Sequence, residues 1–276
     1  MPFSYDVKGT VLQIRNVSHK FADKQILRDI NLTVRDLVRP NRTQGQVVSF
    51  VGPSGSGKTT LFNIISGKYV PTTGEVLLGE EERPVERGGY VGVVSQKNTL
   101  LEHRTVLGNL MIAGHQAGLR TRDAKDKAMG YLSWLGLEQF TGFYPAQLSG
   151  GMRQRVAILQ QLMCSERLLL MDEPFSGLDV VNKDKVCELI AQVANSHELN
   201  TIIITTHDLR TAAGIADTMW ILGRDFDAAG KPVPNGATVK EKYDLIARNL
   251  AWRPDISRSP EFEKFVFEVE DRFRRL

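Results

Sequence analysis

The sequence predicts an α/β fold in which helices cover both faces of a mostly parallel β-sheet. Several short runs rich in branched apolar residues are typical of strands, and the middle and later runs are apolar on both faces. Such runs are characteristic of parallel sheets that are buried on both sides. Segments with helical spacing of apolar residues lie between them, and this alternation indicates the same fold class.

Size and composition are those of an ordinary globular protein: 276 residues, of which 42% are hydrophobic and 24% are charged, enough for a sizeable core. The net charge of +3 is mild, so we expect no nucleic-acid partner. Cys164 and Cys187 lack CxxC spacing, which favours thiols in a reducing cytoplasm over a disulfide or a metal site. The first ten residues do not resemble a secretory signal, and no apolar run approaches the ~18 residues of a membrane span. We therefore expect a partner to supply any membrane spans.

The individual elements follow from these patterns. The predicted strands are Val11–Val17, Gln46–Gly52, Tyr90–Gln96, Arg167–Glu173 and Thr201–His207. The predicted helices are Lys58–Ser66, Thr105–Ala117, Thr121–Leu135, Gly151–Cys164, Val180–Ser196 and Asp208–Ala216. From about residue 100 to 164 there are helices and no convincing strand, which predicts a helical insertion between two strands of the sheet.

Two segments fit the alternation less well. Residues 35–44 are polar and basic with one proline, and we expect a surface hairpin or loop there. The tail from Gly223 begins with turn-forming residues and then places five apolar residues on one helical face. These are Phe262, Phe265, Val266, Val269 and Phe273. An apolar face of this kind needs a cover, either from the parent domain or from a partner subunit.

The stretch GPSGSGKTT (Gly52–Thr60) follows an apolar strand, precedes a helix and fits the phosphate-binding pattern GxxxxGK(S/T). Its glycines let the backbone wrap a phosphate chain, Lys58 can reach the β- and γ-phosphates, and Thr59 can bind Mg²⁺. We expect the whole stretch to bind a nucleoside triphosphate. Its residues are Gly52, Pro53, Ser54, Gly55, Ser56, Gly57, Lys58, Thr59 and Thr60.

Polar residues at the ends of other predicted strands point to the same edge of the sheet, where ligands of open α/β sheets gather. Asp172 and Glu173 end one strand; we assign Asp172 to the Mg²⁺ shell and Glu173 to the general base that polarises the attacking water. His207 ends a second strand, from which it can reach the γ-phosphate or the water, although a structural histidine is the alternative. Gln96 ends a third and is a candidate Mg²⁺ ligand and catalytic residue, with an ordinary polar strand end as the alternative.

A second glycine-containing stretch, QLSGGMRQR (Gln147–Arg155), lies at the predicted start of a helix. Free backbone N–H groups and the positive end of the helix dipole make such a start an anion site. One chain therefore carries two phosphate-binding sequences, about ninety residues apart.

Six features, in their order along the chain, resemble the nucleotide-binding subunit of an ATP-binding cassette (ABC) transporter. They are GPSGSGKTT, Gln96, LSGGMRQRV, LLLMDEP, SGLD (Ser176–Asp179) and His207. The resemblance covers about residues 10–223, with a helical subdomain at about 100–164, and leaves residues 224–276 as a C-terminal extension. It implies the fold of a P-loop NTPase cassette, with a mostly parallel sheet, an antiparallel β subdomain and the inserted helical subdomain.

The same resemblance implies an ATPase that uses ATP and Mg²⁺ and works as a head-to-tail dimer of cassettes around two ATP molecules. Ser149, Gly150 and Gly151 of one cassette would close over the γ-phosphate held by Lys58 of the other, and Asp179 would lie at the same interface. By position, Phe21 matches the aromatic residue that stacks on adenine, although HKF is also compatible with a core phenylalanine.

Exporters usually fuse their membrane spans to the cassette, and we expect no spans here. The segments LLEHRTVLGNL (Leu100–Leu110) and LSGGMRQRVAI (Leu148–Ile158) are together most similar to the importer subunits for nitrate, sulfonate and taurine. The expected partners are a second cassette, transmembrane permease subunits and a solute-binding protein, with the chain peripheral at the cytoplasmic face of the membrane. LQQLMCSER (Leu159–Arg167) departs from the ARAL helix usual in importers. The alternatives are a cassette that drives lipid extraction or cell-wall regulation and, with less support, a soluble ATPase acting on ribosomes or DNA.

Overall fold

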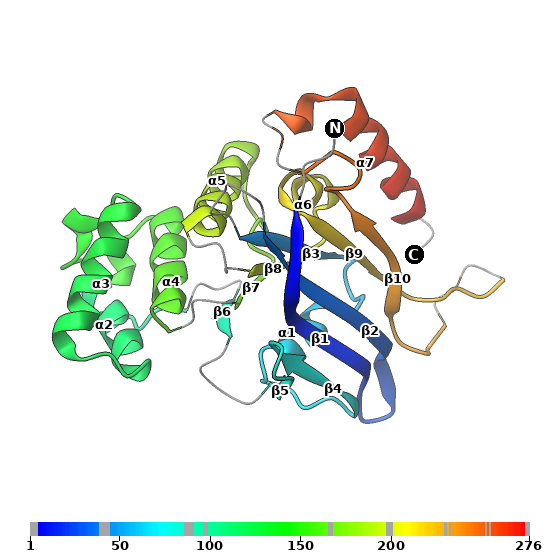
Figure 1. Ribbon diagram of the computed structural model, residues 1–276, viewed down its shortest axis with the longest axis horizontal. Coiled ribbons are helices and arrows are strands. Elements are labelled where there is room, and N and C mark those ends of the chain that lie inside the picture. The colour runs from blue at the N-terminus through cyan, green and yellow to red at the C-terminus, as the bar shows by residue number, and fades with distance from the viewer. Residues whose placement is uncertain are drawn as a thin grey trace.

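The computed structural model describes residues 5–38, 45–85, 91–95, 99–164, 168–196, 201–228, 231, 233–251, 253 and 255–273. Two sheets and a group of helices make up this part of the chain (Figure 1). Within it, no helix is both long enough and apolar enough to cross a membrane.

A six-stranded sheet forms the centre of the molecule, in the order β10-β9-β3-β8-β7-β6. All neighbours in it are parallel except β10 and β9, which are antiparallel. β3 and β8 are buried along their whole length, which confirms the prediction of a parallel sheet covered on both faces. The strands are β3 (Gln46–Val51), β6 (Gly92–Val94), β7 (Leu168–Asp172), β8 (Thr201–Thr206), β9 (Thr218–Gly223) and β10 (Thr238–Asp244).

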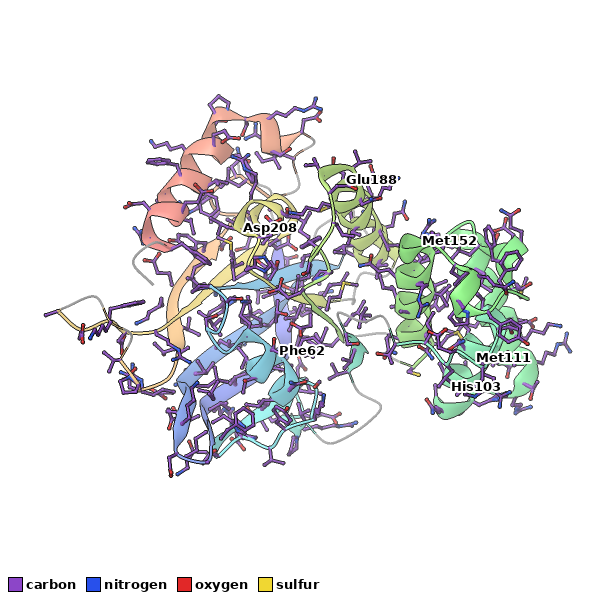
Figure 2. All side chains as sticks on the ribbon, turned by 180° about the vertical axis from the view of Figure 1, so that it is seen from behind. Phe62, His103, Met111, Met152, Glu188 and Asp208 are labelled. Carbon is purple, nitrogen blue, oxygen red and sulfur yellow. The ribbon has the colours of Figure 1, made fainter. Side chains whose placement is uncertain are left out.

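A second, antiparallel sheet has the order β2-β1-β4-β5. Helix α1 (Lys58–Ile65) lies between the two sheets, and its Phe62, labelled in Figure 2, packs with Phe50 of the central sheet in one apolar cluster. One face of the central sheet is therefore covered by α1 together with this second sheet. Its strands are β1 (Asp6–Phe21), β2 (Lys24–Val38), β4 (Thr73–Leu78) and β5 (Arg83–Pro84).

The predicted helical insertion forms a separate group at one end of the molecule (Figure 1), and residues 99–164 contain no strand. Thr105 caps α2, because its side chain accepts a hydrogen bond from the Gly108 N–H at 3.1 Å. Each predicted helix boundary here agrees with the structure within one residue. The elements are α2 (Val106–Gln116), α3 (Thr121–Trp134), the 3₁₀ turns η1 (Glu138–Phe140) and η2 (Pro145–Gln147), and α4 (Gly150–Cys164).

The tail packs on its own domain, so the partner-subunit alternative for its apolar face is wrong. Four apolar residues of α7 (Pro260–Phe273) are buried in the main core, namely Phe262, Phe265, Val266 and Val269, and Phe273 packs against them partly buried. The helix lies beside α6 (Leu209–Ile215) in Figure 1. Arg210 donates to both carboxylate oxygens of Glu263 at 2.6 Å. Helix α5 (Val180–Ser196) has the predicted bounds, and η3 (Ile256–Arg258) precedes α7.

Three predictions in other segments differ from the structure. The strand predicted over Val11–Val17 is part of the longer β1, Asp6–Phe21, which lies in the antiparallel sheet. The strand predicted over Tyr90–Gln96 is shorter, since only Gly92–Val94 form β6, and residues 86–90 and 96–98 lie outside the described residues. The segment 35–44 begins as the end of β2, which continues to Val38. The remainder of that segment, residues 39–44, also lies outside the described part of the chain.

Candidate functional site

The P-loop, residues 52–60, joins β3 to α1 at the carboxyl edge of the sheet. Gly57 adopts φ +84°, and a Cβ there would lie 2.7 Å from the Leu27 side chain. A Cβ on Gly52 would lie 2.5 Å from the Leu222 carbonyl oxygen. Left-handed backbone and close contacts both require glycine, so the surrounding strands fix the shape of this loop.

Lys58 lies folded over the P-loop. Its side chain is buried, and Nζ donates to the carbonyl oxygens of Gly52 at 2.8 Å and of Pro53 at 3.1 Å. Nζ is also 3.7 Å from Oε1 of Glu173. Burial lowers the pKa of the Lys58 ammonium, and the Glu173 carboxylate opposes that shift. The cation is therefore held at the loop by carbonyls and by one acid.

Asp172, the last residue of β7, faces the start of α1. Thr205 Oγ1 donates to its Oδ1, and the Thr59 hydroxyl on α1 lies near enough to lower the pKa of its carboxyl group. Burial raises the pKa of Asp172, while the two threonine hydroxyls act against that rise. The structure therefore places the Asp172 carboxylate at the end of β7 close to the Thr59 hydroxyl at the start of α1.

Glu173 has a backbone conformation that is unusual for its residue type, with φ +49°. A non-glycine residue in the left-handed region costs of the order of 1–3 kcal/mol and is found most often at functional sites. The Glu173 N–H donates to the Thr205 carbonyl at 2.8 Å. Its carboxylate accepts from Thr206 Oγ1 at 3.2 Å and lies 2.9 Å from His207 Nδ1. Because of the turn, Glu173 faces β8 and Lys58.

His207 follows β8 and is more than half exposed, at 57% of its side-chain surface. An ionised Glu173 can only accept, so His207 Nδ1 is the donor in this pair. The next residue, Asp208, caps α6: its carboxylate accepts from the Thr211 N–H at 3.0 Å. Figure 2 shows Asp208 near the ends of the central strands.

The signature loop, Ser149–Gly151, starts α4 in the helical insertion. Ser149 Oγ accepts from the Met152 N–H at 3.3 Å. All three residues are exposed, and a Cβ added at Gly150 or Gly151 would meet no atom within 4 Å. This loop is therefore open where the P-loop is enclosed.

A cavity of about 710 Å³ lies between the signature loop and the central sheet. Its lining runs from Ser149 and Gly150 to Asp172 and Glu173. Figure 2 labels Met152 on α4 and Glu188 on α5, the two helices on either side of it. Of the described residues, none from 52 to 60 lines this cavity. Within one chain, the signature loop thus shares a space with the two acids and not with the P-loop.

Asp179 and Phe21 lie outside the group formed by the P-loop, the acids and His207. Asp179 caps α5: its carboxylate accepts from the Asn182 N–H at 2.9 Å, a contact that lowers the pKa of Asp179. Phe21 is 47% exposed, so it is not a core residue. The rings of His19 and Tyr69 lie edge-on to it, with centroids 4.7 and 5.6 Å away. Gln96 lies outside the described residues.

Sequence patterns did not single out three residues that the site contains. Thr205 and Thr206 at the end of β8 hold the two acids. Their position could have predicted this role, since the carboxyl ends of adjacent parallel strands meet at one edge of the sheet. Arg224, directly after β9, donates to the Gly55 carbonyl at 3.3 Å, and nothing in its local sequence indicates that contact.

Comparison with known proteins identifies the family. The family described as ABC transporter matches residues 38–176. The nitrate import ATP-binding protein NrtD of Synechocystis is 31% identical over 95% of this chain and 95% of its own length. The lipoprotein-releasing system ATP-binding protein LolD of Bacteroides fragilis is 35% identical over 72% of this chain and 91% of its own length.

The fold gives the same result. The structure of cbiO1 from Clostridium perfringens, described as part of the ABC transporter complex cbiONQ, has a TM-score of 0.69 at 22% identity and covers 86% of this chain and 89% of its own. The chain belongs to the ABC transporter family. It is an ATP-binding subunit and an ATPase, of a kind that works with transmembrane permease components.

Proposed function

We propose that this chain hydrolyses ATP as a dimer around two nucleotides and so drives import through separate membrane subunits. In this proposal residues 10–223 form the nucleotide-binding domain, with its helical subdomain at about 100–164, and residues 224–276 form an extension. The observation that carries the proposal is the separation of the two glycine-rich loops: the signature loop is open, and no described P-loop residue lines its cavity.

Nucleotide binding is assigned to the P-loop, residues 52–60. Its backbone N–H groups would surround the phosphates, and Phe21 would stack on adenine. Lys58 would exchange its carbonyl partners and Glu173 for the β- and γ-phosphates. The 3.7 Å contact between Lys58 and Glu173 supports this exchange, because a phosphate that takes over the cation leaves the acid free.

Magnesium is assigned to Thr59 and Asp172, with Gln96 as a further ligand. The nearness of the Thr59 hydroxyl to the Asp172 carboxyl group, whose pKa it lowers, supports this, since oxygen donors that supplement substrate phosphates are what Mg²⁺ takes in nucleotide sites. The bound ion would neutralise charge on the phosphates. Asp172 would then be ionised, because the cation would oppose the effect of burial on its pKa.

Catalysis is assigned to Glu173 and His207. Once Lys58 has turned to the nucleotide, the Glu173 carboxylate can accept a proton from water, as a general base. The 2.9 Å contact of His207 Nδ1 orients that carboxylate. The strained backbone of Glu173 supports a functional role, because strain of this kind persists where the surrounding structure imposes it.

The dimer follows from the open signature loop. Ser149, Gly150 and Gly151 would bind the γ-phosphate held by Lys58 of a second copy, at the N-terminus of α4. Asp179, which caps α5 beside the same cavity, would lie at the interface. Closure of the dimer would exclude water and complete each site, which couples hydrolysis to opening and closing.

Mixed dimers test closure between copies. Ser149→Arg subunits mixed with Lys58→Ala subunits contain one site in which both defects coincide and one site that is intact. We expect the mixture to recover ATP turnover that neither variant has alone. If tagged mixed dimers form, as checked by co-purification, and no turnover returns, closure in trans is wrong.

Import is supported by how far the relatives extend. NrtD and an aliphatic sulfonates import protein, SsuB 1 of Rhodococcus jostii, align with 95% and 89% of this chain, against 72% for LolD. The alignments with the nitrate and sulfonate import proteins are thus longer than that with LolD. They are also longer than those with ThiQ of Yersinia pseudotuberculosis and HrtA of Staphylococcus haemolyticus, whose names refer to thiamine and hemin import and which cover 71% and 72% of this chain. This difference favours the nitrate and sulfonate group. In this proposal the chain is peripheral at the cytoplasmic face and binds permease subunits, which work with a solute-binding protein.

The second candidate is a cassette that drives a non-import membrane machine, and the 35% identity with LolD favours it. Co-purification from native membranes separates the two candidates. A permease together with a secreted solute-binding protein indicates import. A lipid-binding or periplasmic-hydrolase partner in its place would overturn import and support the second candidate.

A further inference from the structure

The connection from β9 to β10, residues 224–237, lies against the P-loop although it is distant from it in sequence. Arg224 Nη2 donates to the Gly55 carbonyl oxygen at 3.3 Å. Gly55 is exposed at the loop tip, has φ +81°, and a Cβ there would meet no atom within 4 Å. The tip thus has no side-chain packing of its own, and Arg224 supplies a hydrogen bond from outside.

This hydrogen bond acts on one peptide unit of the P-loop. The unit that carries the Gly55 carbonyl also carries the Ser56 N–H, which donates to the Pro53 carbonyl at 3.1 Å. Both polar groups of the unit are engaged, so its orientation is fixed. A glycine peptide rotates more readily than any other, and phosphate binding by a P-loop depends on the direction of its N–H groups.

Arg224 projects from a fixed base. Its neighbour Asp225 accepts hydrogen bonds from Arg28 at 2.6 Å and from Asn235 at 2.8 Å, and it also pairs with Lys240. The Lys240 hydrogen bond comes first among the contacts that lower the pKa of Asp225 to about 2. A backbone bond from Ala237 N–H to the Ile26 carbonyl at 2.8 Å ties the other end of the connection to β2.

Within the described residues, no carboxylate forms an ion pair with Arg224. An ion pair therefore does not explain the position of its side chain. We propose that Arg224 is a positioning residue for nucleotide binding, which holds the Gly55 peptide of the P-loop in the orientation that receives phosphates. The inference rests on the proposed role of the P-loop. It adds a contribution of the β9–β10 connection to ATP affinity.

Arg224→Ala in the full chain tests this. We expect Kd and KM for ATP to rise about three- to tenfold, as for loss of a charge-assisted hydrogen bond, with kcat at saturating ATP within about twofold and an unchanged Tm. Arg224→Lys keeps a cation on a shorter donor group and should recover part of the affinity. Lys231→Ala, which removes an exposed cation from the same connection, should behave as wild type.

Hydrogen exchange gives a second readout without nucleotide. Amides of residues 54–57 should exchange faster in Arg224→Ala than in wild type or in Lys231→Ala. An unchanged Kd, or a fall in kcat with unchanged KM, overturns the inference. Lys58→Ala distinguishes failure of this inference from failure of the proposed function. If Lys58→Ala binds ATP like wild type, the proposed role of the P-loop itself is wrong. If Lys58→Ala loses affinity but Arg224→Ala does not, only the inference about Arg224 is wrong.

Discussion

The P-loop and the signature loop are both glycine-rich, and each begins a helix, yet their surroundings differ. In the P-loop, Gly57 packs against Leu27, and Lys58 is buried against carbonyls and an acid. In the signature loop, Gly150 and Gly151 are open, with no atom near an added Cβ. Within one chain, the helix N-terminus at the P-loop is thus enclosed, whereas the helix N-terminus at the signature loop is uncovered. The difference indicates which loop needs a second copy.

The largest expected effect is on the enclosed loop. Lys58→Ala should weaken ATP binding about 100-fold or more, because it removes a cation that is to meet the phosphates in a buried site. A titration with a fluorescent ATP analogue measures it. Lys185→Ala, which removes an exposed lysine at the edge of the 710 Å³ cavity, is the control and should retain wild-type affinity. If the Kd of Lys58→Ala for ATP is within a few-fold of wild type, the P-loop does not differ from the signature loop in the way proposed here.

Glu173→Gln should lower ATP turnover by about 10²- to 10⁴-fold, the range for loss of a general base, while ATP affinity persists. The amide keeps the size of the side chain but cannot accept a proton from water. Steady-state phosphate release measures the change. Glu188→Gln, on α5 at the same cavity, should leave turnover unchanged. Turnover of Glu173→Gln within threefold of wild type would contradict its assigned role.

Ser149→Arg should reduce turnover about 10²-fold, comparable to removal of one oxyanion donor, and leave Kd for ATP within twofold. The arginine fills the open loop without disturbing the P-loop. Phosphate release and the same titration, run on one preparation, separate the two quantities. If affinity falls as far as it does in Lys58→Ala, the signature loop is part of the binding site of its own chain.

Replacing a glycine should destabilise the protein more in the P-loop than in the signature loop. In Gly57→Ala, the left-handed backbone alone costs about 1–2 kcal/mol, and the 2.7 Å approach to Leu27 adds to that cost. We expect Tm to fall by at least about 2 °C. Gly150→Ala meets no neighbour and should change Tm by less than about 1 °C. Equal losses measured by calorimetry would show that both loops are enclosed.

The smallest effect concerns the base of Arg224. The pKa of Asp225 is lowered to about 2 from 3.8, first by Lys240 and then by Asn235. Its stabilisation is therefore present above pH 3.8 and is lost as the pH falls through about 2. Asp225→Asn should lower Tm slightly at neutral pH, and the difference from wild type should shrink as the pH falls from about 4 to about 2. A difference that is constant with pH would show that the charge does not contribute.

Much of the central sheet could be predicted, because β3, β7 and β8 are apolar on both faces and their ends carry the motifs. Strands β2, β4 and β10 did not stand out, since they contain charged residues on exposed faces, and β9 follows α6 too closely for a clear break. For the site, local motifs located Lys58, Asp172 and Glu173. The left-handed turn at Glu173 and the reach of Arg224 depend on contacts between distant segments, which no local pattern encodes.

The tail also affects how the domain folds. Phe262, Phe265, Val266 and Val269 cover the helix that follows His207, and apolar side chains of this kind each contribute about 1.5–3 kcal/mol when buried. Helix α7 follows all six strands of the central sheet in sequence, so it packs onto elements that precede it in the chain. Until α7 docks, the apolar surface of α6 beside the nucleotide site is exposed to water, and an intermediate with such a surface is prone to aggregate.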